Sequence, residues 1–262
     1  MSTADFTPTG RVNVVANTLT IARRNLLHIR TNPEQLVEMT IQPFMFLVLF
    51  VYVFGGAIAG SSREYLQFAL PGILVQSIAF TPFTTALGLN VDFQRGLIDR
   101  FRSLPIARSA VISGRIVADG ARIVWSILII TGFGLVLGFR FGGGIAGALG
   151  ALVLLTAFGL TMCWPMAFIG IASRQPESVN TWGFMIILPL TFASSAFAAP
   201  DTMPGWLQAF VKVNPVTSVI DTTRGLMLGG PVAEPLTDSI IWLAAITAVF
   251  APLAIDRYRR RI

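Results

Sequence analysis

Six stretches of the sequence carry no charged residue, and together they cover most of the chain. They are 39–62, 65–91, 123–139, 141–173, 178–200 and 239–255. The segment 44–54 is apolar on every face, as in a buried or lipid-facing helix, whereas a membrane β-barrel would alternate apolar and polar positions. A helix needs about 20 apolar residues to cross a hydrocarbon core of about 30 Å.

Four of the stretches reach the spanning length. The third and sixth have 17 residues each and reach it with flanking residues whose charges extend to the interface. The pattern therefore predicts an all-α polytopic membrane protein with six transmembrane helices. Five spans are the alternative, if the last stretch only lies against the bundle. The predicted spans are about 36–59, 66–91, 112–138, 146–173, 178–199 and 238–256.

Composition supports a membrane protein, because 54% of the residues are hydrophobic and only 12% are charged, against roughly 25% charged in soluble domains. With six spans, 15 arginines fall on one side of the membrane and four positive residues on the other. The positive-inside rule then places both termini in the cytoplasm, as in a multi-pass protein of the bacterial plasma membrane. The net charge of +6 indicates attraction to anionic lipid and not to nucleic acid.

Residues 1–34 are predicted to form a cytoplasmic tail and an amphipathic helix, and residues 35–262 the transmembrane domain. Apolar residues recur at helical spacing from Val15 to Ile29, with polar residues on another face. Such a helix lies in the membrane interface. Asn32 and Pro33 then fit the N-cap and first position of the next helix.

The second cytoplasmic connection, 92–108, carries an apolar stripe of Leu97, Phe101 and Leu104 at helical spacing. This predicts a short amphipathic helix at the cytoplasmic surface. The composition favours two interpretations equally. Either the helix docks a soluble partner, or it lies on the lipid surface and only holds the loop at the membrane.

The segment 199–238 is too long for a turn and too polar to span the membrane. Asn214 as N-cap and Pro215 at the first position predict a helix that ends near Leu228, with Gly229 as its stop. We expect two short helices that dip into, or lie on, the outer leaflet. Asp221 and Arg224, three residues apart, are expected to pair within the second of them.

Arg115, Asp119 and Arg122 share one face at the start of the third span, where opposite charges pair along a helix. The uncharged interiors of the spans contain no Asp, Glu or Lys, and the sequence has neither a Gly-rich phosphate-binding loop with its lysine nor a cluster of metal ligands. If the chain moves solutes uphill, its energy is therefore expected from another polypeptide. An ion-driven secondary transporter and a non-transporting scaffold are the alternatives from other classes.

The chain resembles the type-2 ABC transporter permeases, in the branch of the daunorubicin and doxorubicin resistance exporters. The residues that carry the resemblance are Phe-Gln-Arg-Gly-Leu-Ile-Asp-Arg-Phe-Arg-Ser-Leu-Pro-Ile at 93–106, Met-Pro-Gly-Trp-Leu at 203–207, Asn-Pro-Val-Thr at 214–217 and Arg-Gly-Leu at 224–226. Many members of the branch carry an acidic residue where this chain has Gln94.

The resemblance implies the membrane subunit of an ATP-driven exporter of drugs or other amphipathic molecules, and not an enzyme. Lipids, polyketides and cell-wall precursors are alternative cargoes. ATP and magnesium would be bound by a separate ATP-binding subunit, with no cofactor or metal in this chain. A second permease chain, identical or related, would complete the assembly. The residues implied in coupling to the ATPase are Gln94, Arg95, Gly96, Leu97, Asp99, Arg100, Phe101, Arg102, Pro105 and Arg108.

A translocation path bordered by the first, second and fifth spans, and capped on the outside, is also implied. The path candidates are Phe44, Phe50, Gln76, Thr81, Thr84, Asn90, Asn180 and Ser194. Buried Thr, Ser and Asn also join helices to one another, so each of these residues has a structural alternative. The cap candidates are Pro204, Trp206, Asn214, Pro215, Asp221 and Arg224.

Overall fold

The computed structural model describes residues 41, 43–55, 60–94 and 108–261, and within them every regular element is a helix. The elements are η1 (Phe50–Phe54), α4 (Ser62–Phe80), α5 (Pro82–Gln94), α7 (Arg108–Val136), α8 (Gly144–Ala172), α9 (Pro176–Phe192), η2 (Pro200–Thr202), α10 (Gly205–Val213), α11 (Pro215–Leu228) and α12 (Ala233–Arg261). The predicted interfacial helix within residues 1–34 and the connection at 95–107 lie outside the described residues.

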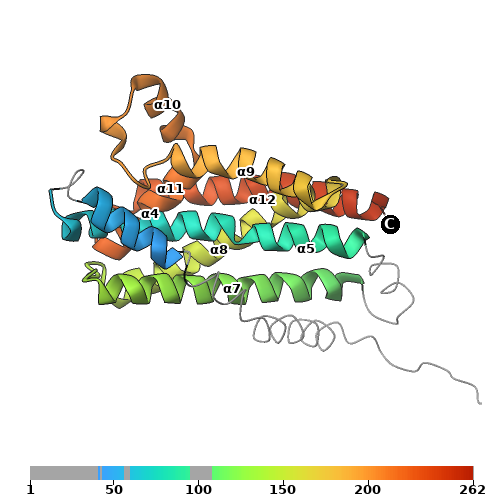
Figure 1. The fold of residues 1–262 in the computed structure, drawn as a ribbon, viewed down its shortest axis with the longest axis horizontal. Coiled ribbons are helices and arrows are strands. Elements are labelled where there is room, and N and C mark those ends of the chain that lie inside the picture. Colours follow the sequence, from blue (N-terminus) through green and yellow to red (C-terminus); the bar gives the residue numbers. More distant parts are fainter. Residues whose placement is uncertain (1–40, 42, 56–59, 95–107, 262) are drawn as a thin grey trace, which may run out of the picture.

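The long helices lie alongside one another in an elongated bundle (Figure 1). Four of them are long and apolar enough to cross a membrane, namely Ser62–Gln94, Asp119–Val136, Gly144–Ala172 and Ala233–Tyr258. The all-α membrane fold is therefore confirmed. Two further apolar helices are shorter: α9 has 17 residues, and Pro43–Val53 is the described part of the predicted first span. The count of six spans stays a prediction.

The span formed by α4 and α5 occupies the centre of the bundle. Its most apolar window is 61% buried inside the chain, whereas that of α12 is only 11% buried. Leu66, Leu70, Ile73 and Ile78 of α4 are fully enclosed. The α12 helix is thus peripheral, with most of its surface left for lipid or another chain.

The positive-inside rule places the charged segments around Gln94, Arg174 and Tyr258 on one side of the membrane, and these three segments do lie at one end of the bundle. Gln94 Nε2 donates to the carbonyl of Arg174 at 3.0 Å, and the rings of Phe93 and Tyr258 lie 5.5 Å apart. We call this end, formed by the ends of α5, α8 and α12 and the start of α9, the α5 end. The opposite end, where α4, α8 and α12 begin, is the α11 end. Which end faces the cytoplasm stays a prediction.

The two predicted short helices are both present, but they differ in position. The α10 helix projects away from the bundle (Figure 1). Its residue Trp206 is 75% exposed. The α11 helix packs against α4, α8 and α12, with nine of its residues buried. Of the two predicted placements, dipping inward or lying on the surface, the inward one therefore fits α11.

Candidate functional site

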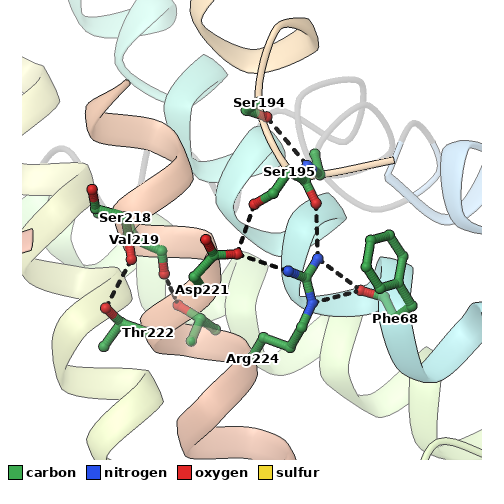
Figure 2. A network of polar contacts seen from close by, with 10 residues as sticks. Phe68, Ser194, Ser195, Ser218, Val219, Asp221, Thr222 and Arg224 are labelled. Atoms are coloured by element: carbon green, nitrogen blue, oxygen red, sulfur yellow. Dashed lines mark hydrogen bonds and ion pairs between the residues drawn. The ribbon is translucent and has the colours of Figure 1, made fainter. Parts of the chain in front are cut away.

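A partly buried polar cluster at the α11 end is the most extensive set of polar contacts among the described residues. Within it, Arg224 Nη1 pairs with Asp221 Oδ1 at 2.8 Å, which confirms the predicted pair within α11. Arg224 Nη2 donates to the carbonyls of Ser195 at 2.8 Å and Phe68 at 3.2 Å, and Arg224 Nε donates to the Phe68 carbonyl at 3.3 Å (Figure 2). The Ser195 hydroxyl donates to Asp221 at 2.7 Å. We call these four residues the Arg224 cluster.

The local sequence of α11 explains how Arg224 reaches this position. Asn214 Oδ1 accepts from the N–H of Val216 at 2.9 Å, and Pro215 follows as the first helical residue. The helix ends at Leu228, where Gly229 has a φ of +81°, a left-handed conformation that glycine adopts without strain. The predicted bounds of this helix are confirmed. Ten residues after the N-cap, Arg224 faces α4.

Asn214 also attaches α11 to the end of α9. Its Nδ2 donates to the carbonyls of Leu190 and Ala193, both at 2.7 Å. These carbonyls lie at the C-terminus of α9, where helical carbonyls lack partners within the helix. The α9 helix thus ends at Phe192, seven residues before the predicted end of its span at 199.

The Arg224 cluster joins three segments that are distant in the sequence: α4, the bend at 193–198, and α11. The guanidinium lies 4.1 Å from the centre of the Phe68 ring, so its charge also faces an aromatic ring. Gly72 allows α4 to approach the bend, because a Cβ at that position would lie 2.5 Å from the Ala196 carbonyl oxygen. The cluster holds the α11 end together through a partly buried charge that has several partners.

The structure divides the cap candidates into two groups. The candidates Asn214, Pro215, Asp221 and Arg224 lie at the N-cap of α11 or within it, in or beside the cluster, whereas Pro204 caps α10 and Trp206 lies within α10, outside the bundle. The contribution of Phe68 was missed, because Phe68 contributes its backbone carbonyl, which has no signature in the sequence. Ser195, also absent from the cap candidates, had a visible signal as a hydroxyl in an otherwise apolar stretch.

Aromatic rings connect the described part of the first predicted span with the second and fifth. Phe50 stacks on Phe197 at 4.3 Å, and Phe197 lies 5.4 Å from Phe192 of α9. Further along α9, Phe184 lies 4.8 Å from Phe83 of α5. Phe44, by contrast, packs on Phe133 of α7 at 4.6 Å.

Most of the α9 surface is uncovered within the single chain. Its buried residues, Val179, Gly183, Ile187 and Thr191, form one stripe at four-residue spacing. The large exposed apolar residues of α9 are Trp182, Phe184, Met185, Ile186, Leu188 and Phe192. A helix with this exposure needs lipid or another chain against it.

The polar path candidates occupy different environments. Asn90 is fully buried, and its Nδ2 donates to the carbonyls of Gly170 at 3.0 Å and Ser173 at 2.9 Å, so it joins α5 to the end of α8. The hydroxyls of Thr81 and Ser194 donate to nearby carbonyls of the chain, and Gln76 is buried in α4. Thr84 and Asn180 are the two polar candidates with exposed side chains.

Most of the coupling candidates, from Arg95 to Pro105, lie outside the described residues. Gln94 ends α5, where its Nε2 donates to Asn90 Oδ1 at 3.0 Å as well as to the α8–α9 connection, and Arg108 begins α7. In α7 the expected ion pair between Asp119 and Arg122 is present at 3.1 Å. Within the described ranges, no three His, Cys, Asp or Glu side chains are placed to hold a metal ion.

Comparison with known proteins adds a family match to this geometry. The family model described as ABC-2 type transporter matches residues 16–228. The chain is 38% identical over 251 residues to the daunorubicin resistance ABC transporter permease protein DrrB1 of Streptomyces coeruleorubidus, covering 96% of this chain and 89% of the relative. It is 24% identical to the doxorubicin resistance ABC transporter permease protein DrrB of Mycobacterium tuberculosis strain ATCC 25618 / H37Rv, covering 80% of this chain and 77% of the relative.

Proposed function

Because the chain belongs to the ABC-2 type transporter family, as the non-catalytic membrane permease subunit of an ABC exporter, we propose that it exports amphipathic, drug-like molecules. The observation that carries the proposal is the identity of 38% to a daunorubicin resistance permease over nearly the whole of both chains. A separate subunit that binds ATP and magnesium supplies the energy, and two permease chains together enclose the path.

The ATP-binding subunit docks on the connection at 95–107, at the α5 end. Leu97 and Phe101 are its apolar anchors, and Arg100, Arg102 and Arg108 orient the contact. Support comes from the residues at the start of this connection. Because Gln94 bonds both Asn90 and the Arg174 carbonyl, a push on the connection reaches α5 and the α8–α9 connection together. ATP-driven closure of the paired subunits thus tilts these spans between two access states.

The path lies against the exposed face of α9 and the helix Pro43–Val53, with the second permease chain opposite. Support comes from the uncovered apolar side chains of both helices and from the contacts of Phe50 and Phe184 with neighbouring rings. Thr84 and Asn180 contribute polar groups along this face, since their side chains are exposed. At the α11 end, the Arg224 cluster keeps the bend after α9 in place beside the path.

The test is ATP-driven uptake of daunorubicin into inverted membrane vesicles that contain the permease and its ATP-binding subunit. Phe101→Ala removes the central anchor, and truncation of such a residue commonly costs 2 kcal/mol or more, or roughly 30-fold in affinity. We expect less ATPase to co-purify with the variant and uptake to fall at least several-fold, with the permease still inserted. The matched control is Phe210→Ala, on exposed α10, which leaves both unchanged.

Two outcomes would contradict the proposal. Normal drug-stimulated ATPase activity and uptake in Phe101→Ala would remove the coupling assignment. Accumulation of drug by the purified chain alone, driven by a proton or sodium gradient, would instead assign it to the secondary transporters.

A further inference from the structure

A cavity of about 230 Å³ opens at the α5 end, lined by Ala172, Arg174, Arg257 and Arg260. It lies where α8 ends and the last turns of α12 pass by, and these two helices pack along each other. The cavity is separate from the Arg224 cluster and from the exposed face of α9. No step of the proposed transport cycle uses the side chains of its three arginines.

The charges around the cavity favour an anion. Arg260 Nε pairs with Asp256 Oδ2 at 2.8 Å. Within the described residues, Arg174 and Arg257 have no carboxylate within ion-pair distance, and both side chains are exposed. Of the three arginines that line the cavity, only Arg260 thus has a carboxylate partner in the described part of the chain, and a guanidinium group binds phosphate through two parallel hydrogen bonds.

The position of the cavity relative to the membrane indicates which kind of anion it binds. Ala172 is the last residue of α8, and Asp256 is the first charged residue after the uncharged stretch 239–255 of α12. Both mark the level at which the hydrocarbon ends. On α12, the exposed apolar residues Val249 and Leu253 lead at four-residue spacing to Arg257, and the same face continues to Arg260. An apolar stripe that ends in arginines matches an acyl chain followed by its headgroup.

We propose that this cavity binds the phosphate of an anionic phospholipid, whose acyl chains lie along Val249 and Leu253 of α12. Basic pockets between transmembrane helices bind such headgroups in other membrane proteins. A bound lipid would also steady the start of the predicted docking connection. The cavity is attached to the end of α5 through the bond from Gln94 to the Arg174 carbonyl and the contact of Phe93 with Tyr258. The binding itself does not depend on the proposed transport function.

The experiment measures phosphatidylglycerol retained by the full chain in mass spectrometry from mixed micelles, with phosphatidylcholine as the neutral competitor. The variant Arg174→Gln/Arg257→Gln is compared with Arg63→Gln/Arg140→Gln, which removes the same charge from exposed sites at the α11 end. Two arginines at an anionic surface account for roughly 30-fold in affinity. We expect a loss of that order in the first variant and no more than about twofold in the second.

A second pair of variants guards against misfolding. Arg257→Gln alone, near the exposed end of α12, should lose less affinity than the double variant: on a logarithmic scale, about a third to a half of the double variant's loss. Arg257→Lys should retain most of the binding. Equal retention of the two lipids by the unmodified chain would overturn the proposal, as would equal losses in the two double variants. Displacement of the lipid by millimolar inorganic phosphate would also overturn it, because the cavity would then bind a free anion.

Discussion

Replacing Arg224 with methionine is the sharpest test of the Arg224 cluster. Methionine keeps the length of the side chain but removes every donor, which leaves Asp221 and the carbonyls of Phe68 and Ser195 without the guanidinium. Removing one partner of a buried ion pair costs about 3–5 kcal/mol. The Arg224 and Asp221 side chains are 18% and 37% exposed, respectively, so water screens part of the interaction. We therefore expect a loss near the lower bound, about 3 kcal/mol.

The single cysteine of the chain provides the assay. Cys163 lies in α8 and is 6% exposed, so a thiol-reactive dye labels it when the bundle opens. For a chain of this size, 1 kcal/mol corresponds to roughly 2–4 °C in Tm, which predicts a decrease of about 6–12 °C for Arg224→Met. The control Arg63→Met removes an exposed arginine at the same end, and we expect its Tm to stay within about 2 °C.

A double-mutant cycle with Asp221→Asn separates the ion pair from the carbonyl contacts. If the bonds to Phe68 and Ser195 matter as the geometry indicates, Arg224→Met still lowers the Tm in the Asp221→Asn background, by at least half of its effect in the unmodified chain. A double variant as stable as Asp221→Asn alone would refute this reasoning. An unchanged Tm for Arg224→Met itself would refute the whole cluster.

Two further predictions concern the contacts between helices, both measured by labelling of Cys163. Asn90→Leu leaves two carbonyls at the C-terminus of α8 without their donor, which costs about 1–3 kcal/mol and should lower the Tm by roughly 2–12 °C. Thr84→Val at an exposed site should leave the Tm unchanged, and equal shifts in the two variants would contradict the buried role of Asn90. Gly72→Val should lower it at least as far, because its side chain would meet the Ala196 carbonyl, and an unchanged Tm would show that α4 does not touch the bend.

Local signals in the sequence were sufficient to predict the bounds of α11 but not its burial. Asn214, Pro215 and Gly229 set its ends through contacts within a few residues. The polarity and length of the segment 199–238 left two placements open, dipping into the outer leaflet or lying on it. In the structure, the hydroxyls of Thr222 and Thr223 donate to carbonyls one turn back, and Thr222 also bonds Ser239 of α12. Hydroxyls satisfied in this way can be buried.

Contacts between distant segments explain what the sequence did not predict. The end of α9 depends on the Asn214 side chain, 22 residues after Phe192. The pair of Asp221 with Arg224 followed from their spacing, but its anchoring on α4 depends on the backbone carbonyl of Phe68. The coupling residues between Arg95 and Pro105 stay predictions from resemblance, because no described contact involves them.

One span connects both functional ends of the chain, and its interruption matters for the proposed motion. Ser62–Gln94 carries the Phe68 carbonyl at one end and Asn90 at the other. Between them, Pro82 has no N–H to donate to the Ile78 carbonyl, which accepts from the N–H of Thr81 at 3.2 Å instead. A bend at this break lets α5 tilt while the Arg224 cluster stays closed, whereas a rigid span must open the cluster to move. If Arg224→Met lowers the Tm but leaves ATP-driven uptake unchanged, the tilting motion is confined to the part of the span on the α5 side of Pro82. If Arg224→Met lowers both the Tm and the uptake, the whole span moves together with the Arg224 cluster.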